Sequence, residues 1–128
     1  MSNSFDKTDN SREPGTGPVV VQSLEELKPI MFSQHAPYLM ACVVKNEIFR
    51  EQMDAIEGVA RQFENTLGTL VISGELVGCF CKKFNVKGTP TFLFFMNGKE
   101  RDRILGCISR ESLTEFVARN LQTINRKT

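Results

Sequence analysis

Continuous apolar runs alternate along the chain with amphipathic stretches, and this alternation predicts strands separated by helices. The run "YLMACVV" at 38–44 is apolar throughout, which favours a strand buried on both faces. Over 49–63, apolar residues recur at spacings of three and four, which places them on one face of a helix. Shorter apolar runs at 19–21 and 69–72 predict two more strands.

The C-terminal part of the chain predicts a hairpin followed by a helix. The aromatic run "TFLFFM" at 91–96 precedes Asn97-Gly98, a pair that readily takes the positive φ angles of a tight turn, so a strand should return over about 101–105. The pattern over residues 75–84 predicts a helix, although Gly78 weakens this prediction because glycine has a low helix propensity. Ser109 can cap a last helix. Its apolar face contains Leu113, Phe116, Val117, Leu121 and Ile124.

The N-terminal part completes the order of elements. Ser23 and Glu26 form a capping-box pattern before a short helix that Pro29 limits. The predicted order is therefore β-α-β-α-β-α-β-β-α. Strands separated by helices are expected to pair in parallel through right-handed crossovers, whereas the final hairpin is antiparallel. These features predict an α/β protein of three layers, α/β/α, with a central mixed sheet and a C-terminal β-hairpin plus helix.

Composition and charge narrow the class of protein. The 128 residues are 41% hydrophobic and 24% charged, as in one soluble globular domain. The net charge of +1 offers no electrostatic basis for binding nucleic acid or a membrane surface. Residues 1–18 are polar and predict a disordered leader before a domain at 19–128. Because no signal peptide or membrane-spanning run is evident, we expect a cytoplasmic protein, and we expect a monomer.

Four cysteines and a single histidine are the candidate reactive groups: Cys42, Cys79, Cys81, Cys107 and His35. No two cysteines have the Cys-x-x-Cys spacing. Cys79 and Cys81 lie two residues apart on a predicted helix and should point to different faces, so a disulfide between them would be strained. Cys42 is expected in the core. With one histidine and no paired cysteines, we expect no metal site and no cofactor.

The stretch "NVKGTPTFLFFMNGK" at 85–99, within this order of elements, resembles the thioredoxin family. The resemblance covers roughly residues 19–124 and extends to "LGCISRESLTEFV", which leads into the last helix. It implies the thioredoxin fold and a cis peptide bond before Pro90. It also implies that Thr89 presents its N–H and C=O to an extended peptide, a form of strand addition. Alternatively, Pro90 only makes the bend that starts a strand.

The same resemblance shows what this chain lacks. Thioredoxin enzymes carry Cys-x-x-Cys at the start of the helix after the central strand, and the matching positions here are Asn46 and Phe49. A dithiol exchanger needs one thiolate to attack and a second thiol to resolve the mixed disulfide, and neither residue can do this. Met40 matches the buried Asp of the family, and Lys45 matches the Trp before the first Cys.

We therefore expect a redox-inactive domain that binds a protein or peptide partner in a chaperone-like or assembly role, with no catalytic residue. The resemblance implies a groove formed by Asn46, Glu47, Ile48, Phe49, Thr89, Pro90, Gly106 and Cys107. Ile48 and Phe49 would supply apolar contacts, and Glu47 some selectivity for a basic partner.

Two alternatives stay open. The first is an atypical thiol-disulfide oxidoreductase that uses Cys107, Cys42 or the Cys79/Cys81 pair. Cys107 would lie at the rim of the groove, and Cys42 in "CVVK" could align as a single nucleophile. The second is a structural remnant whose partner docks on another face of the domain.

Overall fold

The computed structural model describes residues 17–31 and 37–127. Most of the expected leader at 1–18, and His35, lie outside the described residues. Within them the chain forms a five-stranded sheet with the strand order β1-β3-β2-β4-β5. The strands are β1 (Val19–Val20), β2 (Tyr38–Cys42), β3 (Gly68–Ile72), β4 (Thr91–Met96) and β5 (Lys99–Leu105). The helices are η1 (Leu24–Glu26), α2 (Leu27–Met31), α3 (Phe49–Gln62), α4 (Leu76–Phe84) and α5 (Arg110–Lys127).

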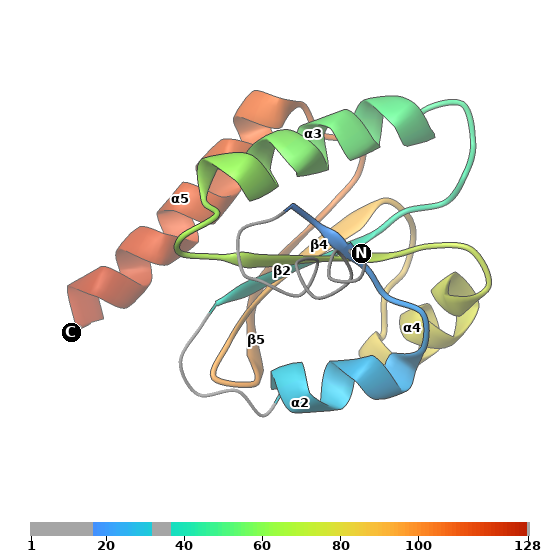
Figure 1. Cartoon of the computed structure of the whole chain (residues 1–128), viewed down its shortest axis with the longest axis horizontal. Helices are drawn as coiled ribbons and strands as arrows, with labels where there is room; N and C mark the ends of the chain where they lie inside the picture. Colours follow the sequence, from blue (N-terminus) through green and yellow to red (C-terminus); the bar gives the residue numbers. More distant parts are fainter. Residues whose placement is uncertain (1–16, 32–36, 128) are drawn as a thin grey trace, which may run out of the picture.

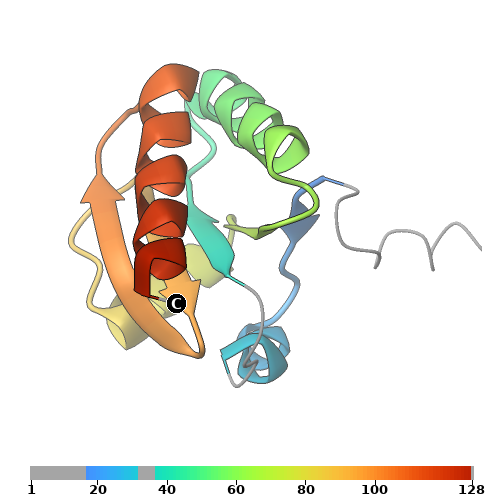
Figure 2. The same cartoon turned by 90° about the vertical axis from the view of Figure 1, so that its left-hand side faces the viewer.

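The sheet is mixed, as the sequence predicts. Strand β3 pairs in parallel with β1 and with β2, whereas β4 is antiparallel to both β2 and β5. Helices α3 and α5 lie side by side on one face, and α2 and α4 lie on the other (Figure 1 and Figure 2). The predicted order of elements and the three-layer α/β/α class are confirmed.

Alternation along the buried strands builds two apolar clusters, one on each face of the sheet. In β4, Phe92 and Phe94 face α3 and α5, whereas Leu93 and Phe95 face the layer that contains α4. In β2, Cys42 belongs with the second set and is completely buried. Because both faces of these strands are covered, their sequences read as continuous apolar runs.

Several predicted turns and caps are present. Asn97 and Gly98 have φ angles of 55° and 76°, as a two-residue hairpin turn requires. Ser109 Oγ accepts a hydrogen bond of 3.1 Å from the N–H of Ser112 and so caps α5. Ser23 Oγ accepts from Glu25 N–H, while the Glu26 carboxylate accepts from Gln22 N–H. The predicted capping pattern of Ser23 and Glu26 is therefore present, and it starts the 3-10 turn η1 that precedes the short helix α2.

The end of α4 is held by β5. The Arg103 guanidinium donates hydrogen bonds to the carbonyl oxygens of Phe84 and Asn85, at 2.9 and 3.0 Å. Asn85 adopts a left-handed conformation with φ of 55°, which ends the helix. This arrangement positions the loop that leads to Pro90.

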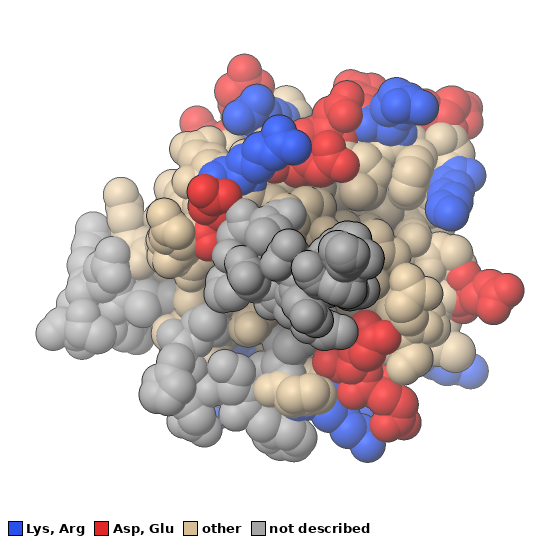
Figure 3. Space-filling model, viewed as in Figure 1, with Lys and Arg blue, Asp and Glu red and all other residues tan. Residues whose placement is uncertain are grey.

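Charged side chains are interspersed on the face seen in Figure 3, where basic and acidic groups alternate over the helices without an extended area of one sign. Among the described helices, none has the length and apolar character needed to cross a bilayer.

Candidate functional site

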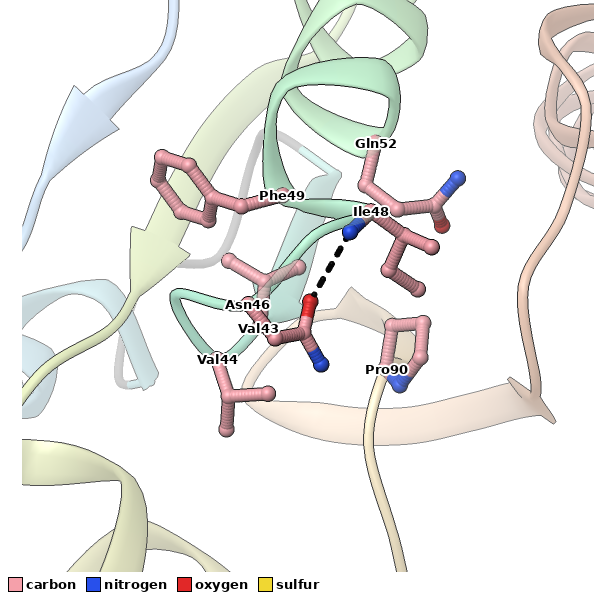
Figure 4. A pocket seen from close by; sticks show the side chains of 7 residues that line it. All are labelled: Val43, Val44, Asn46, Ile48, Phe49, Gln52 and Pro90. Atoms are coloured by element: carbon pink, nitrogen blue, oxygen red, sulfur yellow. Dashed lines mark hydrogen bonds between the residues drawn. The ribbon is translucent and has the colours of Figure 1, made fainter.

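The turn between β2 and α3 is held by Asn46, which stands where the resemblance places the first cysteine of the redox motif. Its Oδ1 accepts a hydrogen bond of 3.1 Å from Ile48 N–H, and its carbonyl accepts one of 3.0 Å from Phe49 N–H. Asn side chains commonly stabilise turns in this way. Figure 4 shows the amide of Asn46 directed at the start of α3. Asn46 thus has a structural role in the turn.

The second part of the site is the loop before β4. The Thr89–Pro90 peptide bond is cis, the isomer that the resemblance implies. Thr91 Oγ donates to the carbonyl of Gly88 at 2.6 Å, and Gly106 N–H donates to the carbonyl of Pro90 at 2.8 Å. Gly106 has a φ of 119°, which a side chain would strain. The loop is therefore fixed to the end of β5.

A small hollow of about 160 Å³, which includes space open to solvent, lies between these two parts. It is lined by Val43, Val44, Asn46, Ile48, Phe49, Gln52 and Pro90. In Figure 4 the side chain of Ile48 lies beside Pro90, whereas the ring of Phe49 points the other way. That ring packs against the apolar cluster under α3, with Lys45 Nζ 6.0 Å from its centroid. Of the two expected apolar contacts, Ile48 is the one directed toward Pro90.

The remaining expected groove residues lie around this hollow. Thr89 is half-buried, and Gly106 reaches Pro90 through its N–H. Cys107 is exposed. Glu47 is also exposed, and so are Lys45 and Arg50, which flank it in the sequence. We therefore do not assign Glu47 a preference for basic partners.

Gln52 is a site residue that the sequence analysis missed. It lies on α3 and is 2% exposed. Its Nε2 donates to the carbonyl of Ile108 at 3.1 Å, and its Oε1 accepts from the N–H of Ile108 at 3.4 Å. Gln52 follows Phe49 by three residues and precedes Ile56 by four, so helical spacing alone would place it on the buried face. The bond joins α3 to the segment that follows Cys107.

Leu105 is a second residue that the sequence analysis did not single out. It is 58% exposed at the end of β5, opposite Thr91. A methyl group of Leu105 lies close to Gly88, in the loop that carries Thr89. An exposed apolar side chain therefore lies beside that loop.

The four cysteines are reduced thiols in different environments. Cys42 is buried, as expected, Cys79 and Cys107 are exposed, and Cys81 is half-buried. Burial raises the pKa of the Cys42 thiol to about 12, and the charge and hydrogen bond of the neighbouring Cys81 thiol act in the same direction. A thiol that stays protonated at neutral pH is a poor first nucleophile, which argues against Cys42 as the single attacking group.

This environment predicts a pH dependence of stability. The pKa of Cys42 is raised in the folded state, so its contribution is fully present below the ordinary thiol pKa and is lost as the pH rises toward 12. Between pH 8 and 10, the wild type should lose roughly 1–2 kcal/mol more unfolding free energy than Cys42→Ala. Urea unfolding under reducing conditions measures this difference. Parallel pH profiles for the two proteins would contradict it.

No three His, Cys, Asp or Glu side chains converge into a metal-binding group within the part of the chain that the structure describes.

The family model described as Thioredoxin matches residues 51–119, more than half of the chain. The chain belongs to the thioredoxin family. This finding confirms the resemblance that the sequence indicates. The matched residues include the loop at Pro90 and most of α3, and this thioredoxin-family chain contains no Cys-x-x-Cys.

Individual relatives are distant. The chain is 22% identical over 98 residues to "Thioredoxin M-type, chloroplastic" of Spinacia oleracea, which covers 77% of this chain and 50% of that protein. It thus spans about half the length of that curated relative. Thioredoxin from Trypanosoma brucei brucei superposes with a TM-score of 0.73 at 17% identity, over 86% of this chain and 95% of that one. A mutant thioredoxin from Halobacterium salinarum gives 0.70 at 17% identity, over 81% and 90%. Such identities show the shared fold alone.

Proposed function

We propose that this thioredoxin-family domain binds an extended segment of a partner protein, without a covalent bond, at a surface that we call the Pro90 groove. The groove consists of Ile48, Thr89, Pro90 and Gly106. The observation that carries the proposal is that the backbone N–H and C=O of Thr89 form no hydrogen bond to any described residue. An extended chain can pair with two such groups by strand addition.

The size of the hollow supports a polymer as the ligand. The hollow is shallow and encloses almost no space that could surround a small molecule, unlike typical small-molecule pockets. Side chains of an extended segment alternate in direction, so one can contact Ile48 while its backbone pairs with Thr89. Leu105, exposed beside the same loop, offers a second apolar contact. We therefore propose an apolar, extended peptide as the ligand.

The chemistry of the groove supports non-covalent binding. Asn46 and Phe49 occupy the two positions of the usual redox motif, and neither an amide nor a phenyl ring can act as the nucleophile. In the structure Asn46 stabilises the turn, and the ring of Phe49 packs against the core. A partner would be held and released without thiol exchange, which suits a chaperone-like or assembly role. We base this role on the chemistry of the site and not on the fold, because one fold can carry several functions.

Peptide binding tests the proposal directly. An array of short peptides from unfolded proteins would select a binder, whose affinity is then measured by calorimetry. Ile48→Asp should weaken binding at least about tenfold, or 1.4 kcal/mol, because it places a charge against the apolar side chain of the peptide. Val20→Asp is the matched control, since Val20 is 48% exposed on β1, at the opposite edge of the sheet. It should leave the affinity unchanged.

Two results would overturn this assignment. Amide resonances that shift along β1, while Thr89 and Ile48 stay unperturbed, would place the partner on another face. Catalytic reduction of insulin disulfides that disappears in Cys107→Ser would favour the oxidoreductase alternative.

A further inference from the structure

The last turn of α4 and the loop that follows it carry basic side chains and no acidic ones. Between Glu75 and Glu100 the chain contains four lysines and neither aspartate nor glutamate. Three of these lysines are exposed and lie at the end of α4 or directly after it, and we call them the lysine patch: Lys82, Lys83 and Lys87. Because the whole chain has a net charge of only +1, the residues outside the patch are negative in sum.

The acidic side chains of β5, the strand beside the end of α4, are engaged elsewhere and do not neutralise the patch. The guanidinium of Arg103 donates to Glu100 Oε1 at 2.8 Å, and it also holds the end of α4 through two carbonyl oxygens. Asp102 Oδ2 accepts a hydrogen bond of 3.0 Å from Asn120 of α5. Among the described residues, no carboxylate forms an ion pair with a lysine of the patch.

The end of α4 explains part of this charge pattern. The C-terminal carbonyls of a helix act as about half a negative charge and favour basic residues in the last turn. This effect favours Lys82 and Lys83, whereas Lys87 lies beyond the helix, which ends at Phe84. Most of the positive charge of the patch therefore stays unbalanced and can attract an anionic ligand.

The lysine patch adjoins the Pro90 groove. Lys87 precedes Thr89 by two residues, and the N–H of Val86 bonds to the carbonyl of Cys81 at 2.8 Å, which ties this loop to α4. A partner segment that pairs with Thr89 and continues past Gly88 therefore comes alongside Lys87 and approaches the end of α4. Opposite charges on facing residues of paired strands attract each other.

We propose that the partner segment carries acidic residues next to the apolar residue that contacts Ile48, and that the lysine patch binds these acidic residues. This inference rests on the proposed function, because it names the class of peptide that the Pro90 groove binds. An acidic protein segment is favoured over nucleic acid, because the basic charge is confined to three lysines beside a peptide groove in a chain of net charge +1.

A peptide series tests the charge preference. Its members share the apolar core selected by the array and carry Glu-Glu-Glu, Gln-Gln-Gln or Lys-Lys-Lys, either before or after that core. In one of the two orientations, the Glu peptide should bind wild-type protein about three- to tenfold more tightly than the Gln peptide, and the Lys peptide should bind more weakly. Calorimetry at about 50 mM salt measures these affinities. At about 500 mM salt the differences should fall below about twofold, because salt screens exposed charges.

Substitution of the patch tests its position. The variant Lys82→Gln/Lys83→Gln/Lys87→Gln should bind the Glu and Gln peptides with equal affinity. A matched control removes the same charge from exposed residues on other parts of the fold: Lys28→Gln/Arg61→Gln/Lys99→Gln. The control should keep the preference for the Glu peptide. If both variants lose it equally, the preference reflects the overall charge of the chain and the lysine patch is not the site.

The remaining outcomes separate this inference from the proposed function. If the Glu and Gln peptides bind wild-type protein equally and Ile48→Asp weakens both, the acidic preference is overturned and the Pro90 groove stands. If no peptide of the series binds in a way that depends on Ile48, both proposals fail. A single-stranded oligonucleotide that binds more tightly than the Glu peptide, and loses its affinity in the patch variant, would identify nucleic acid as the ligand and overturn the inference.

Discussion

A Phe92→Ala variant is expected to lose about 3–5 kcal/mol of unfolding free energy. Phe92 is completely buried in β4, between Ala41 of β2 and Ile104 of β5. Its ring belongs to the cluster under α3 and α5, so its removal leaves a cavity that the paired strands cannot close. The loss is a large part of the 5–15 kcal/mol that stabilise a typical domain. Urea unfolding followed by circular dichroism measures it.

Leu105→Ala is the control for this substitution. Leu105 lies on the neighbouring strand, opposite Thr91, but is 58% exposed. Its truncation should change the unfolding free energy by less than about 0.5 kcal/mol. Equal losses in the two variants would mean that the cluster on the α3 and α5 face is not the main core of the domain.

Gln52→Leu is expected to cost about 1–3 kcal/mol, although it adds an apolar side chain of similar size to a buried position. The reason is that Gln52 is the hydrogen-bond partner of both the N–H and the C=O of Ile108. Leucine would leave these two groups without a partner away from water. Denaturant unfolding measures the cost. Hydrogen exchange should also become faster at the Ile108 amide, because that N–H loses its acceptor.

Gln62→Leu provides the comparison, since Gln62 ends the same helix and is exposed. It should stay within about 0.5 kcal/mol of the wild type. If Gln52→Leu were as stable as the wild type, the link between α3 and the segment after β5 would have no energetic role, and the Pro90 groove would need another support on that side.

The fold was largely predictable because its elements follow from local patterns. The strand at 91–96 has the bounds that its apolar run predicts, and Asn97-Gly98 turns the chain as expected. The return strand starts at Lys99, two residues earlier than predicted, because a two-residue turn lets Met96 pair with Lys99 at once. The central strand ends at Cys42, although the apolar run continues to Val44. The N–H of Val43 still donates a hydrogen bond to the carbonyl of Ile72 in β3. The N–H of Asn46, however, donates to the carbonyl of Val44, so the chain turns and the strand ends.

The candidate site was predictable in part. The match of "GTPT" placed Pro90 opposite the start of the helix, and the structure brings Asn46, Ile48 and Pro90 to one hollow. The direction of the Phe49 ring was not predictable, because spacing assigns a residue to a helix face but does not say which neighbours fill that face. For Gln52, spacing indicates burial, but its partner Ile108 is remote in the sequence.

The sequence by itself determined the elements, their order and the lack of a Cys-x-x-Cys motif, because alternation, helical spacing and turn chemistry act between near neighbours. Only the tertiary structure decided what surrounds each thiol. The sequence places Cys79 and Cys81 on different faces of a helix, and in the structure Cys79 is exposed whereas Cys81 is half-buried. Cys81 packs against the apolar cluster that contains Cys42, because α4 packs on that face of the sheet. Contacts of this kind depend on the packing of helix on sheet, which no local pattern specifies.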